Sequence, residues 1–246
     1  FSLLPVDADV ANGEVRALAL DGSRLYLGGT FTSVGGQTRE RAAAVNAGTF
    51  AVDAGYVANA GTQIFGFNGA VNAIAVTPSH VYLGGDFFSI NGVNRGRLAR
   101  TDSTGAVDNA WFPLGVGIFF TTNIINGQVL SIAPAGTDVF VGGAFTSFGS
   151  RNPASVRLVR LNNTNGDLVT NFAADASVQA LHTSDDQATV FAGGAFTSDG
   201  AKHTRAHVLA ERGCNNEAEA RAVLVGLELA QHLGARHVRL LVDSAV

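Results

Sequence analysis

The feature of this chain that most constrains its fold is a nine-residue segment that occurs four times. The copies read LYLGGTFTS (25–33), VYLGGDFFS (81–89), VFVGGAFTS (139–147) and VFAGGAFTS (190–198). Their Gly-Gly pairs begin at residues 28, 84, 142 and 193, so successive copies are 56, 58 and 51 residues apart. A near-constant period of this kind means that the chain is a series of similar structural units.

Each unit is predicted to be a group of short β-strands joined by tight turns. An alternating stretch, 15–20 in the first unit and 71–76 in the second, precedes the aromatic strand that ends at Gly-Gly. A third strand carries RLAR (97–100) in the second unit and RLVRL (157–161) in the third, and an Asn/Asp/Gly-rich turn follows it. The units end on aromatic residues, at 111–112 and at Phe172. Four strands per unit at this period predict the blade of a β-propeller.

The composition agrees with this prediction and excludes several classes of protein. Thirty glycines but only 5 prolines in 246 residues favour many tight turns and short strands. Charged residues make up 15%, against a usual share of about 25%, which excludes a disordered or polybasic segment. A net charge of −4 gives no electrostatic attraction to nucleic acid or an anionic membrane, and no apolar run approaches the roughly 18 residues of a membrane helix.

Recurring residues within the units have predicted structural roles. We expect the paired glycines, which lack Cβ atoms, to let the strand nearest the axis bend and neighbouring blades approach closely. A phenylalanine follows each pair and is predicted to pack between blades; the four are Phe31, Phe87, Phe145 and Phe196. Arg100 and Arg160 occupy matching positions, so each is expected to pair with an acid of the turn that follows, Asp102 or Asp167.

The repeat also resembles a known family. The order of aromatic strand, Gly-Gly, Phe-Thr-Ser, Arg-Leu-x-Arg, turn and terminal phenylalanine is similar to the delta-60 repeat family of β-propellers, over residues 1–211. The resemblance implies a mainly β chain whose four recognisable blades form a possibly incomplete ring. It further implies a noncatalytic interaction or scaffold module of a bacterial secreted or cell-surface protein, with a protein or glycan ligand that the sequence does not name.

The ends of the repeat region leave two arrangements open. Residues 1–12 match the tail of a unit, and the fourth unit has a third strand near 205–211 but no closing turn or aromatic. An N-terminal strand could complete the last blade and close a four-bladed ring, or a larger ring could be truncated at both ends. We favour the larger ring, because closure with so few blades demands strong twist. The absence of methionine and the start at Phe1 indicate a processed chain or a fragment.

The composition changes from Cys214 onwards, where we place the boundary between a propeller region (1–212) and a second segment (213–246). Asn216, with Glu219 three residues later, is typical of a helix N-terminus. Apolar residues at helical spacing predict a helix over 217–233, and Gly234 is a stop signal. An alternating strand then ends at Asp243. The region near Arg212 is expected to join two unrelated coding pieces.

This second segment resembles the ribonuclease H-like family, whose members use carboxylates and two divalent metal ions to hydrolyse the RNA strand of a hybrid. The resemblance matches Glu219 to the helix carboxylate and Asp243 to the one at the strand end, which would bind Mg²⁺. The family also needs a leading aspartate. The nearest, Asp199, occupies a turn of the repeat only 20 residues before Glu219, too few for the intervening hairpin. We therefore expect Glu219 and Asp243 to be inactive.

Other possible sites are weaker. The histidines at 203, 207, 232 and 237 form no metal-ligating pair on one element, and the single Cys214 excludes an internal disulfide. The oxygen-rich stretch 162–167 is interpreted as a turn, since it lacks the glutamate of a calcium loop.

Two functions from different classes remain. The first is the noncatalytic propeller module, extracellular or at the cell surface, with no cofactor. The alternative is a metal-dependent ribonuclease H-like enzyme acting on RNA–DNA hybrids in the cytoplasm. Coverage of the chain favours the first.

Overall fold

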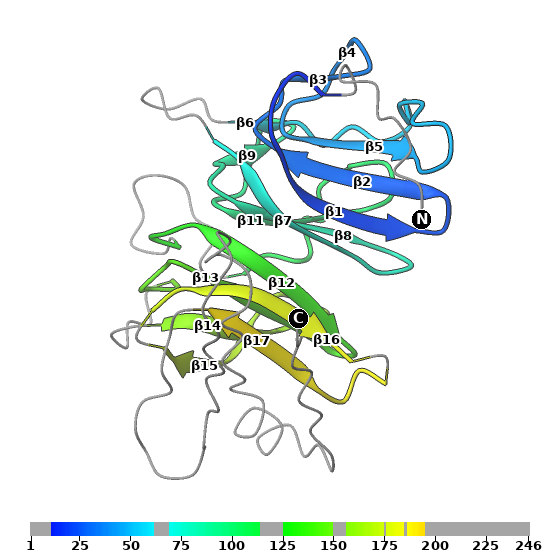
Figure 1. The fold of residues 1–246 in the computed structure, drawn as a ribbon. Helices are drawn as coiled ribbons and strands as arrows, with labels where there is room; N and C mark the ends of the chain where they lie inside the picture. Colours follow the sequence, from blue (N-terminus) through cyan, green and yellow to red (C-terminus); the bar gives the residue numbers. More distant parts are fainter. Residues whose placement is uncertain are drawn as a thin grey trace, which may run out of the picture.

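A computed structural model describes residues 11–61, 69–113, 125–149, 156–174, 176–184 and 186–194. Every regular element in these ranges is a strand, and the strands form small antiparallel sheets that follow one another along the chain (Figure 1). The chain is therefore mainly β, as predicted. The expected helix over 217–233 and the strand ending at Asp243 lie outside the described residues.

Four of the sheets are the blades. Blade 1 consists of β1 (Val15–Asp21), β2 (Arg24–Gly29) and β5 (Ala42–Asn46). Blade 2 consists of β7 (Val71–Val76), β8 (Val81–Gly85) and β11 (Leu98–Thr101). Blade 3 consists of β12 (Val129–Ala135), β13 (Asp138–Gly143), β14 (Val156–Asn162) and β15 (Leu168–Ala173). The described part of blade 4 is the hairpin of β16 (Val178–Thr183) and β17 (Val190–Gly194).

Short strands lie between the second and third strands of blades 1 and 2 and in the segment that joins these two blades. These are β3 (Ser33–Val34), β4 (Gln37–Thr38), β6 (Ala60–Gly61), β9 (Ser89–Ile90) and β10 (Val93–Asn94). β3 pairs with β4, and β9 lies between β6 and β10 in a small sheet. In blades 1 and 2 the segment after the Gly-Gly pair thus leads into a short hairpin before the third strand.

Among the described residues, the predicted fourth strand is complete in blade 3 and incomplete in blades 1 and 2. In blades 1 and 2 the same position holds one isolated bridge, Val45 to Val52 and Thr101 to Val107. An aspartate follows each bridge, and its side chain accepts a backbone N–H two residues later: Gly55 N bonds Asp53 Oδ1 at 2.8 Å. Such a turn ends the strand. Blade 3 has the β-branched Thr170 at this place, which continues the strand as β15.

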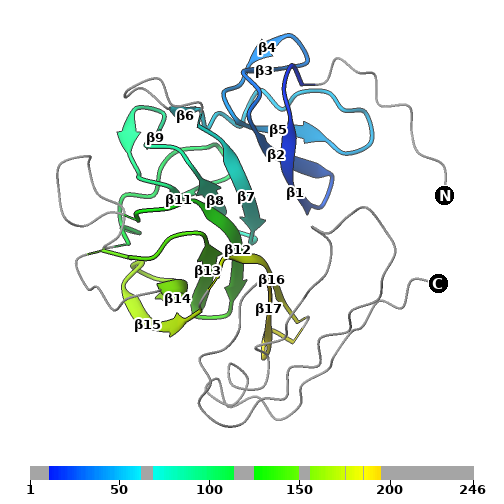
Figure 2. The ribbon, with the colours of Figure 1, turned by 60° about the vertical axis from the view of Figure 1, so that its left-hand side comes forward.

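The blades surround a common axis, with β1, β7, β12 and β16 side by side along its inner wall (Figure 2). Each inner strand pairs with its Gly-Gly strand in one shared register. Val15 lies opposite Gly29, and the equivalent pairs are Val71 with Gly85, Val129 with Gly143 and Val178 with Gly194. This common register confirms the predicted equivalence of the four Gly-Gly pairs, and with it the β-propeller architecture.

The glycines act differently from the prediction, because they lie on the second strand of each blade and not on the strand nearest the axis. A Cβ on Gly84, the first glycine of its pair, would lie 2.4 Å from Val129 Cγ1 of the next blade. A Cβ on Gly85, the second glycine, would lie 2.0 Å from the Ala70 carbonyl oxygen of its own blade. The first glycine therefore lets two blades approach, and the second lets two strands of one blade approach.

The core consists of separate apolar clusters between successive blades. Phe87 packs with Tyr26 and Tyr56 between blades 1 and 2, and Phe145 packs with Trp111 between blades 2 and 3. These two contacts confirm the predicted role of the recurring phenylalanine. Phe31 is buried in a smaller cluster on blade 1, and Phe196 lies outside the described residues. Blades 3 and 4 meet over Phe140 and small side chains.

Candidate functional site

The carboxylates predicted by resemblance cannot be placed. Glu219 and Asp243, together with Asp199 and the histidines at 203, 207, 232 and 237, lie outside the described residues. Within the described ranges no group of three or more His, Cys, Asp or Glu side chains could hold a metal ion. The candidate site among the described residues must therefore be sought in the propeller.

The predicted arginine pairs exist with other acids. Arg100 pairs with Asp108 at 2.5 Å and Arg160 with Asp138 at 2.7 Å, in place of Asp102 and Asp167. Asp102 instead accepts hydrogen bonds from the backbone and hydroxyl of Thr104, two residues along the same turn. An aspartate at the start of a tight turn satisfies its own backbone first, so it does not reach the arginine on the preceding strand.

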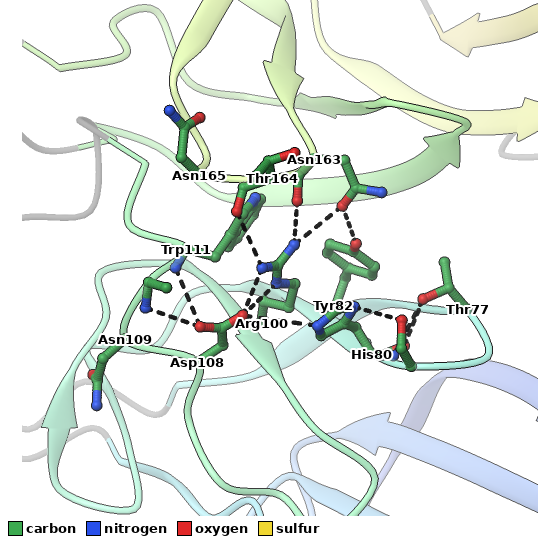
Figure 3. Close-up of polar contacts among 12 residues, drawn as sticks. Thr77, His80, Tyr82, Arg100, Asp108, Asn109, Trp111, Asn163, Thr164 and Asn165 are labelled. Carbon is green, nitrogen blue, oxygen red and sulfur yellow. Dashed lines mark hydrogen bonds and ion pairs between the residues drawn. The ribbon is translucent and has the colours of Figure 1, made fainter.

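Arg100 is the centre of a polar cluster between blades 2 and 3 (Figure 3). Its buried guanidinium donates to Asp108 Oδ2 through Nε at 2.9 Å and Nη2 at 2.5 Å. On the other side it donates to the carbonyl oxygens of Asn163 and Thr164, in the turn after β14 of blade 3. One side chain of blade 2 thus satisfies the turn of the next blade.

Aromatic side chains enclose this Arg100 cluster. The Trp111 ring lies 5.3 Å from the guanidinium carbon, and its Nε1 donates to the Asn162 carbonyl oxygen at 3.2 Å. Tyr82 contacts Trp111 edge to face, with 5.6 Å between ring centres, and its hydroxyl donates to the Asn163 side chain. Cation, rings and hydrogen bonds therefore connect blade 2 to a single turn of blade 3.

Blade 1 builds the same contact with an arginine from another strand. Arg24, at the start of β2, pairs with Asp53 at 2.6 Å and donates to the Ser103 carbonyl oxygen of blade 2 at 3.0 Å. Tyr26 and Tyr56 stand where blade 2 has Tyr82 and Trp111, again edge to face, at 5.0 Å. Recurrence of this arrangement at two junctions shows that it joins blades, and that it is no isolated reactive centre.

The electrostatics of the Arg100 cluster also describe a stable ion pair. Burial would raise the pKa of Asp108, but hydrogen bonds from Arg100 and from backbone N–H groups hold the pKa below its usual range. Burial lowers the pKa of His80, 3.8 Å from Asp108, and the charge of Arg100 lowers this pKa further. Burial raises the pKa of Tyr82. Asp108 is therefore charged at neutral pH, as its ion pair with Arg100 requires, and Tyr82 is neutral.

The side chain at the β-bulge of each inner strand differs in type from blade to blade. One extra residue stands near the start of each inner strand, before the alternating part; the four are Arg16, Asn72, Leu130 and Gln179. Arg16 donates to Asn72 Oδ1 at 3.1 Å across the first junction, so successive bulges lie next to one another. Bulges re-aim side chains and are common beside functional sites. These four residues are the candidate binding site, here called the bulge row.

The oxygen-rich stretch 162–167 is a turn that bonds to itself. Asn162 Oδ1 accepts Thr164 N at 2.7 Å, and Asn165 Oδ1 accepts Asp167 N at 3.0 Å. Gly166 has a positive φ of 82°, which closes the turn. The side-chain oxygens of Asn162 and Asn165 are thus directed to the turn's own backbone, and that of Asn163 accepts from Tyr82 and Arg100.

Two family models match parts of the chain. One, described as a beta-propeller domain of unknown function, matches residues 80–110, which include β8 to β11. The other, described as reverse transcriptase-like, matches residues 175–246. The chain thus has one segment similar to a β-propeller domain and one segment similar to a reverse transcriptase-like domain. The second match includes the β16–β17 hairpin, whose register is that of the other blades, so the boundary at 212 stays a prediction.

Several solved structures are similar to this chain, and one of them is a WD40 domain. A chain of the Mitotic Checkpoint Complex is 18% identical, with a TM-score of 0.43, over 73% of this chain and 46% of that one. The Neurospora crassa Pan2 WD40 domain is 9% identical, with a TM-score of 0.45, over 77% of this chain and 46% of that one. The computationally designed Ika4 protein is 13% identical, with a TM-score of 0.41, over 75% of this chain and 87% of that one. This chain spans about half the length of the first two. No curated protein matches.

Sequence reasoning missed the bulge row and the Arg24 contact. The bulges have no sequence signature other than the valine before them, because the residue itself varies. No repeated pattern marks Arg24 in the sequence. The fold places its guanidinium at the junction of blades 1 and 2, where it makes the contact that Arg100 makes at the next junction.

Proposed function

We propose that this chain acts as a noncatalytic interaction or scaffold module of the delta-60 repeat type, in a bacterial secreted or cell-surface protein. One observation carries the proposal: the repeated charged clusters of the described blades, around Arg24 and Arg100, are engaged between blades, while variable side chains collect at the bulge row. A rigid repeated scaffold with variable residues at one place is the usual design of a binding protein. Within the described residues no helix is long and apolar enough to cross a membrane.

The bulge row is the surface that we propose for ligand binding. Arg16 and Gln179 are exposed there, and the half-buried Asn72 and Leu130 lie between them in the order of the blades. The Gln179 amide can bond hydroxyl and carbonyl groups, and Leu130 offers an apolar contact. Arg16 is already paired with Glu14 at 2.8 Å and bonded to Asn72, so its charge is neutralised. Such a set suits an uncharged polar ligand, either a peptide backbone or a glycan.

Arrays of glycans and of peptides, probed with the labelled full chain, test this proposal. The double variant Arg16→Ala/Gln179→Ala is expected to lose binding about tenfold or more. The control Asp21→Asn/Thr137→Ala changes exposed residues at the opposite ends of two inner strands and should bind as the unmodified chain does. Equal loss in both variants, or none in the bulge variant, would exclude the bulge row.

The reverse transcriptase-like match favours one second candidate, a metal-dependent ribonuclease H-like hydrolase. Under this reading Glu219 and Asp243 bind Mg²⁺ and the substrate is an RNA–DNA hybrid. A two-metal site needs several converging carboxylates, and the sequence supplies two of them without the leading aspartate. We therefore expect no activity.

Cleavage of a labelled RNA–DNA hybrid with Mg²⁺ or Mn²⁺ decides between the two functions. The comparison is the unmodified chain against the variant Glu219→Gln/Asp243→Asn. Metal-dependent cleavage that the variant abolishes would establish the enzyme, whereas cleavage that persists in the variant would indicate a contaminating nuclease. Ligand binding without cleavage would support the interaction module.

A further inference from the structure

The three described junctions between blades share one apolar contact. The inner strand of the following blade begins with a valine, and an isoleucine or leucine comes three residues later. At the junction of blades 2 and 3, a Cβ built on Gly84 would lie 2.4 Å from Val129 Cγ1 and 2.9 Å from Ile132 Cδ1. The same is true of Gly28 with Val71 and Ile74, at 2.7 and 3.0 Å. The glycine has no Cβ and so leaves a notch in its strand, which these two side chains fill.

Blade 1 presents the same side chains without a cover. Val15 and Leu18 of β1 occupy the register positions of Val129 and Ile132 in β12. Val129 is fully buried and Ile132 is 7% exposed, whereas Val15 is 39% and Leu18 61% exposed. Leu20, on the same side of β1, is 60% exposed. This outward side of β1, here called the knob face, has the composition of a blade junction, and no described blade covers it.

Blade 4 presents the complementary side. Phe191 of β17 occupies the position of Tyr82 and Phe140, which the following blade buries completely. Phe191 itself is only partly buried. Gly193 is the first glycine of its pair and so holds the notch position in this blade. The His182 ring stacks on Phe191 with 6.4 Å between ring centres, which gives this side of blade 4 a flat aromatic surface. We call this surface the notch face.

We propose that the knob face of one chain docks on the notch face of a second copy of the same chain. The reason to choose a second copy is that the two faces are the two ends of one arc. They do not meet within a chain, since β16 packs on β12 and the knob face of β1 is exposed (Figure 2). Each has the geometry of the established junctions, so blade 4 of one copy can precede blade 1 of another.

Two copies joined in this way would close. A head-to-tail contact generates a ring when its rotation is complete, and two chains of four blades give eight, within the range of about four to eight that propellers contain. Both knob faces and both notch faces are then covered. The ring places two bulge rows around one axis, which joins the proposed binding surfaces of two chains.

The test is the mass of the full chain in solution, by sedimentation velocity over a range of concentrations. The knob variant Leu18→Asp puts a charge into the contact, and the notch variant Gly193→Val fills the glycine position. Phe191→Glu is a second notch variant, in case the valine disturbs the hairpin. Circular dichroism confirms that each variant keeps its strands, and Ser23→Ala, at an exposed turn, is the control.

The unmodified chain and the control are expected to sediment as two chains, and each variant alone as one chain. An equimolar mixture of the knob and notch variants should again form a two-chain species, because it retains one intact knob face and one intact notch face. A single-chain mass for the unmodified protein at all concentrations would overturn the proposal. So would two-chain mass in either variant alone, or a mixture that stays monomeric; the latter result would indicate that the two faces do not contact each other.

Discussion

The junction between blades 2 and 3 and the junction between blades 3 and 4 use the same backbone contact with different side chains. The first contains Trp111, Tyr82, Phe145 and Phe148, all buried, together with the Arg100 cluster. The second contains Phe140 and mostly alanine and valine. Its polar links are Thr183 Oγ1 to the Pro134 carbonyl oxygen at 2.9 Å and Gly136 N to Gln187 Oε1 at 2.7 Å. Among the described residues, no guanidinium connects blade 3 to blade 4 at this junction.

This difference shows which contact both junctions share and which contact only one of them has. Both junctions have the glycine notch, so the notch is a condition of the fold. The cation between aromatic rings is present at one and replaced by neutral hydrogen bonds at the other, so it is an additional source of stability. Buried charge in this propeller is consequently a property of particular junctions, and it is no indication of catalysis.

The largest expected effect is on the aromatic contact of the first junction. Trp111→Ala removes a fully buried indole, its hydrogen bond to Asn162 and its contact with Arg100. We expect a loss of about 3–5 kcal/mol in the free energy of unfolding, measured by urea denaturation with circular dichroism. The matched change at the second junction, Phe172→Ala, removes a partly exposed ring and should cost less than about half as much. Equal losses would mean that the two junctions have similar stability.

The Arg100 cluster is expected to have the next largest effect. Arg100→Met keeps the aliphatic volume but leaves Asp108 and the carbonyl oxygen of Asn163 without their donor. Removing one partner of a buried pair costs about 3–5 kcal/mol, and partial solvation of Asp108 reduces this to about 2–3 kcal/mol.

Two further variants isolate the charge. Arg160→Met breaks the more exposed pair with Asp138, within blade 3, and should cost about 1 kcal/mol or less. The double variant Arg100→Met/Asp108→Asn removes the stranded charge and should recover part of the loss. No recovery would show that the arginine stabilises the junction through packing and its bonds to blade 3.

The fold was predictable from the sequence because the repeat is strong. The Gly-Gly pairs, the alternating strands and the buried Phe87 and Phe145 follow directly from residues at fixed spacing. The number of strands per blade was not predictable, since it depends on whether an aspartate or Thr170 follows the bridge. This choice between a side-chain turn and a strand is local, and the repeat conceals it.

For the polar contacts, the sequence predicted which types of residue pair and not which individual residues do. Matching positions for Arg100 and Arg160 correctly indicated structural ion pairs, but sequence proximity suggested the wrong acids. Asp108 lies six residues beyond the expected Asp102, and Asp138 lies on the neighbouring strand, so the true pairs depend on strand register and turn geometry. Arg24 shows the same limit. It lies on another strand than Arg100, so its place in the repeat does not indicate that it contacts the next blade.

The notch itself is expected to have a smaller effect, and a similar one at both junctions. A Cβ on Gly142 would lie 2.6 Å from Val178 Cγ1, close to the 2.4 Å for Gly84 and Val129. Gly84→Ala and Gly142→Ala should each cost about 1–2 kcal/mol, because the valines must shift in a packed core. Gly48→Ala is the control, since its nearest neighbour would be 3.5 Å away. A loss at one junction alone would disprove the shared notch.

The smallest expected effect is the pH response of the first junction, which follows from His80. The pKa of this histidine is lowered in the folded chain by burial and by the charge of Arg100. The unfolded chain therefore binds a proton at a higher pH than the folded chain does, so stability falls as the pH is lowered through the ordinary histidine pKa of about 6.5. Between pH 7 and 5 Asp108 keeps its charge, because its own pKa is lowered.

Thermal unfolding of the unmodified chain and of His80→Gln, compared at pH 7 and pH 5, measures this response. The unmodified chain should lose more stability than the variant on acidification, since only it has a cation to accommodate beside Arg100. Ser23→Ala, at an exposed turn, is the control, and its pH response should equal that of the unmodified chain. If His80→Gln also left the response unchanged, the proton would be taken up elsewhere. The Arg100 cluster would then tolerate a charged His80, and the carboxylate of Asp108 would have to neutralise both cations.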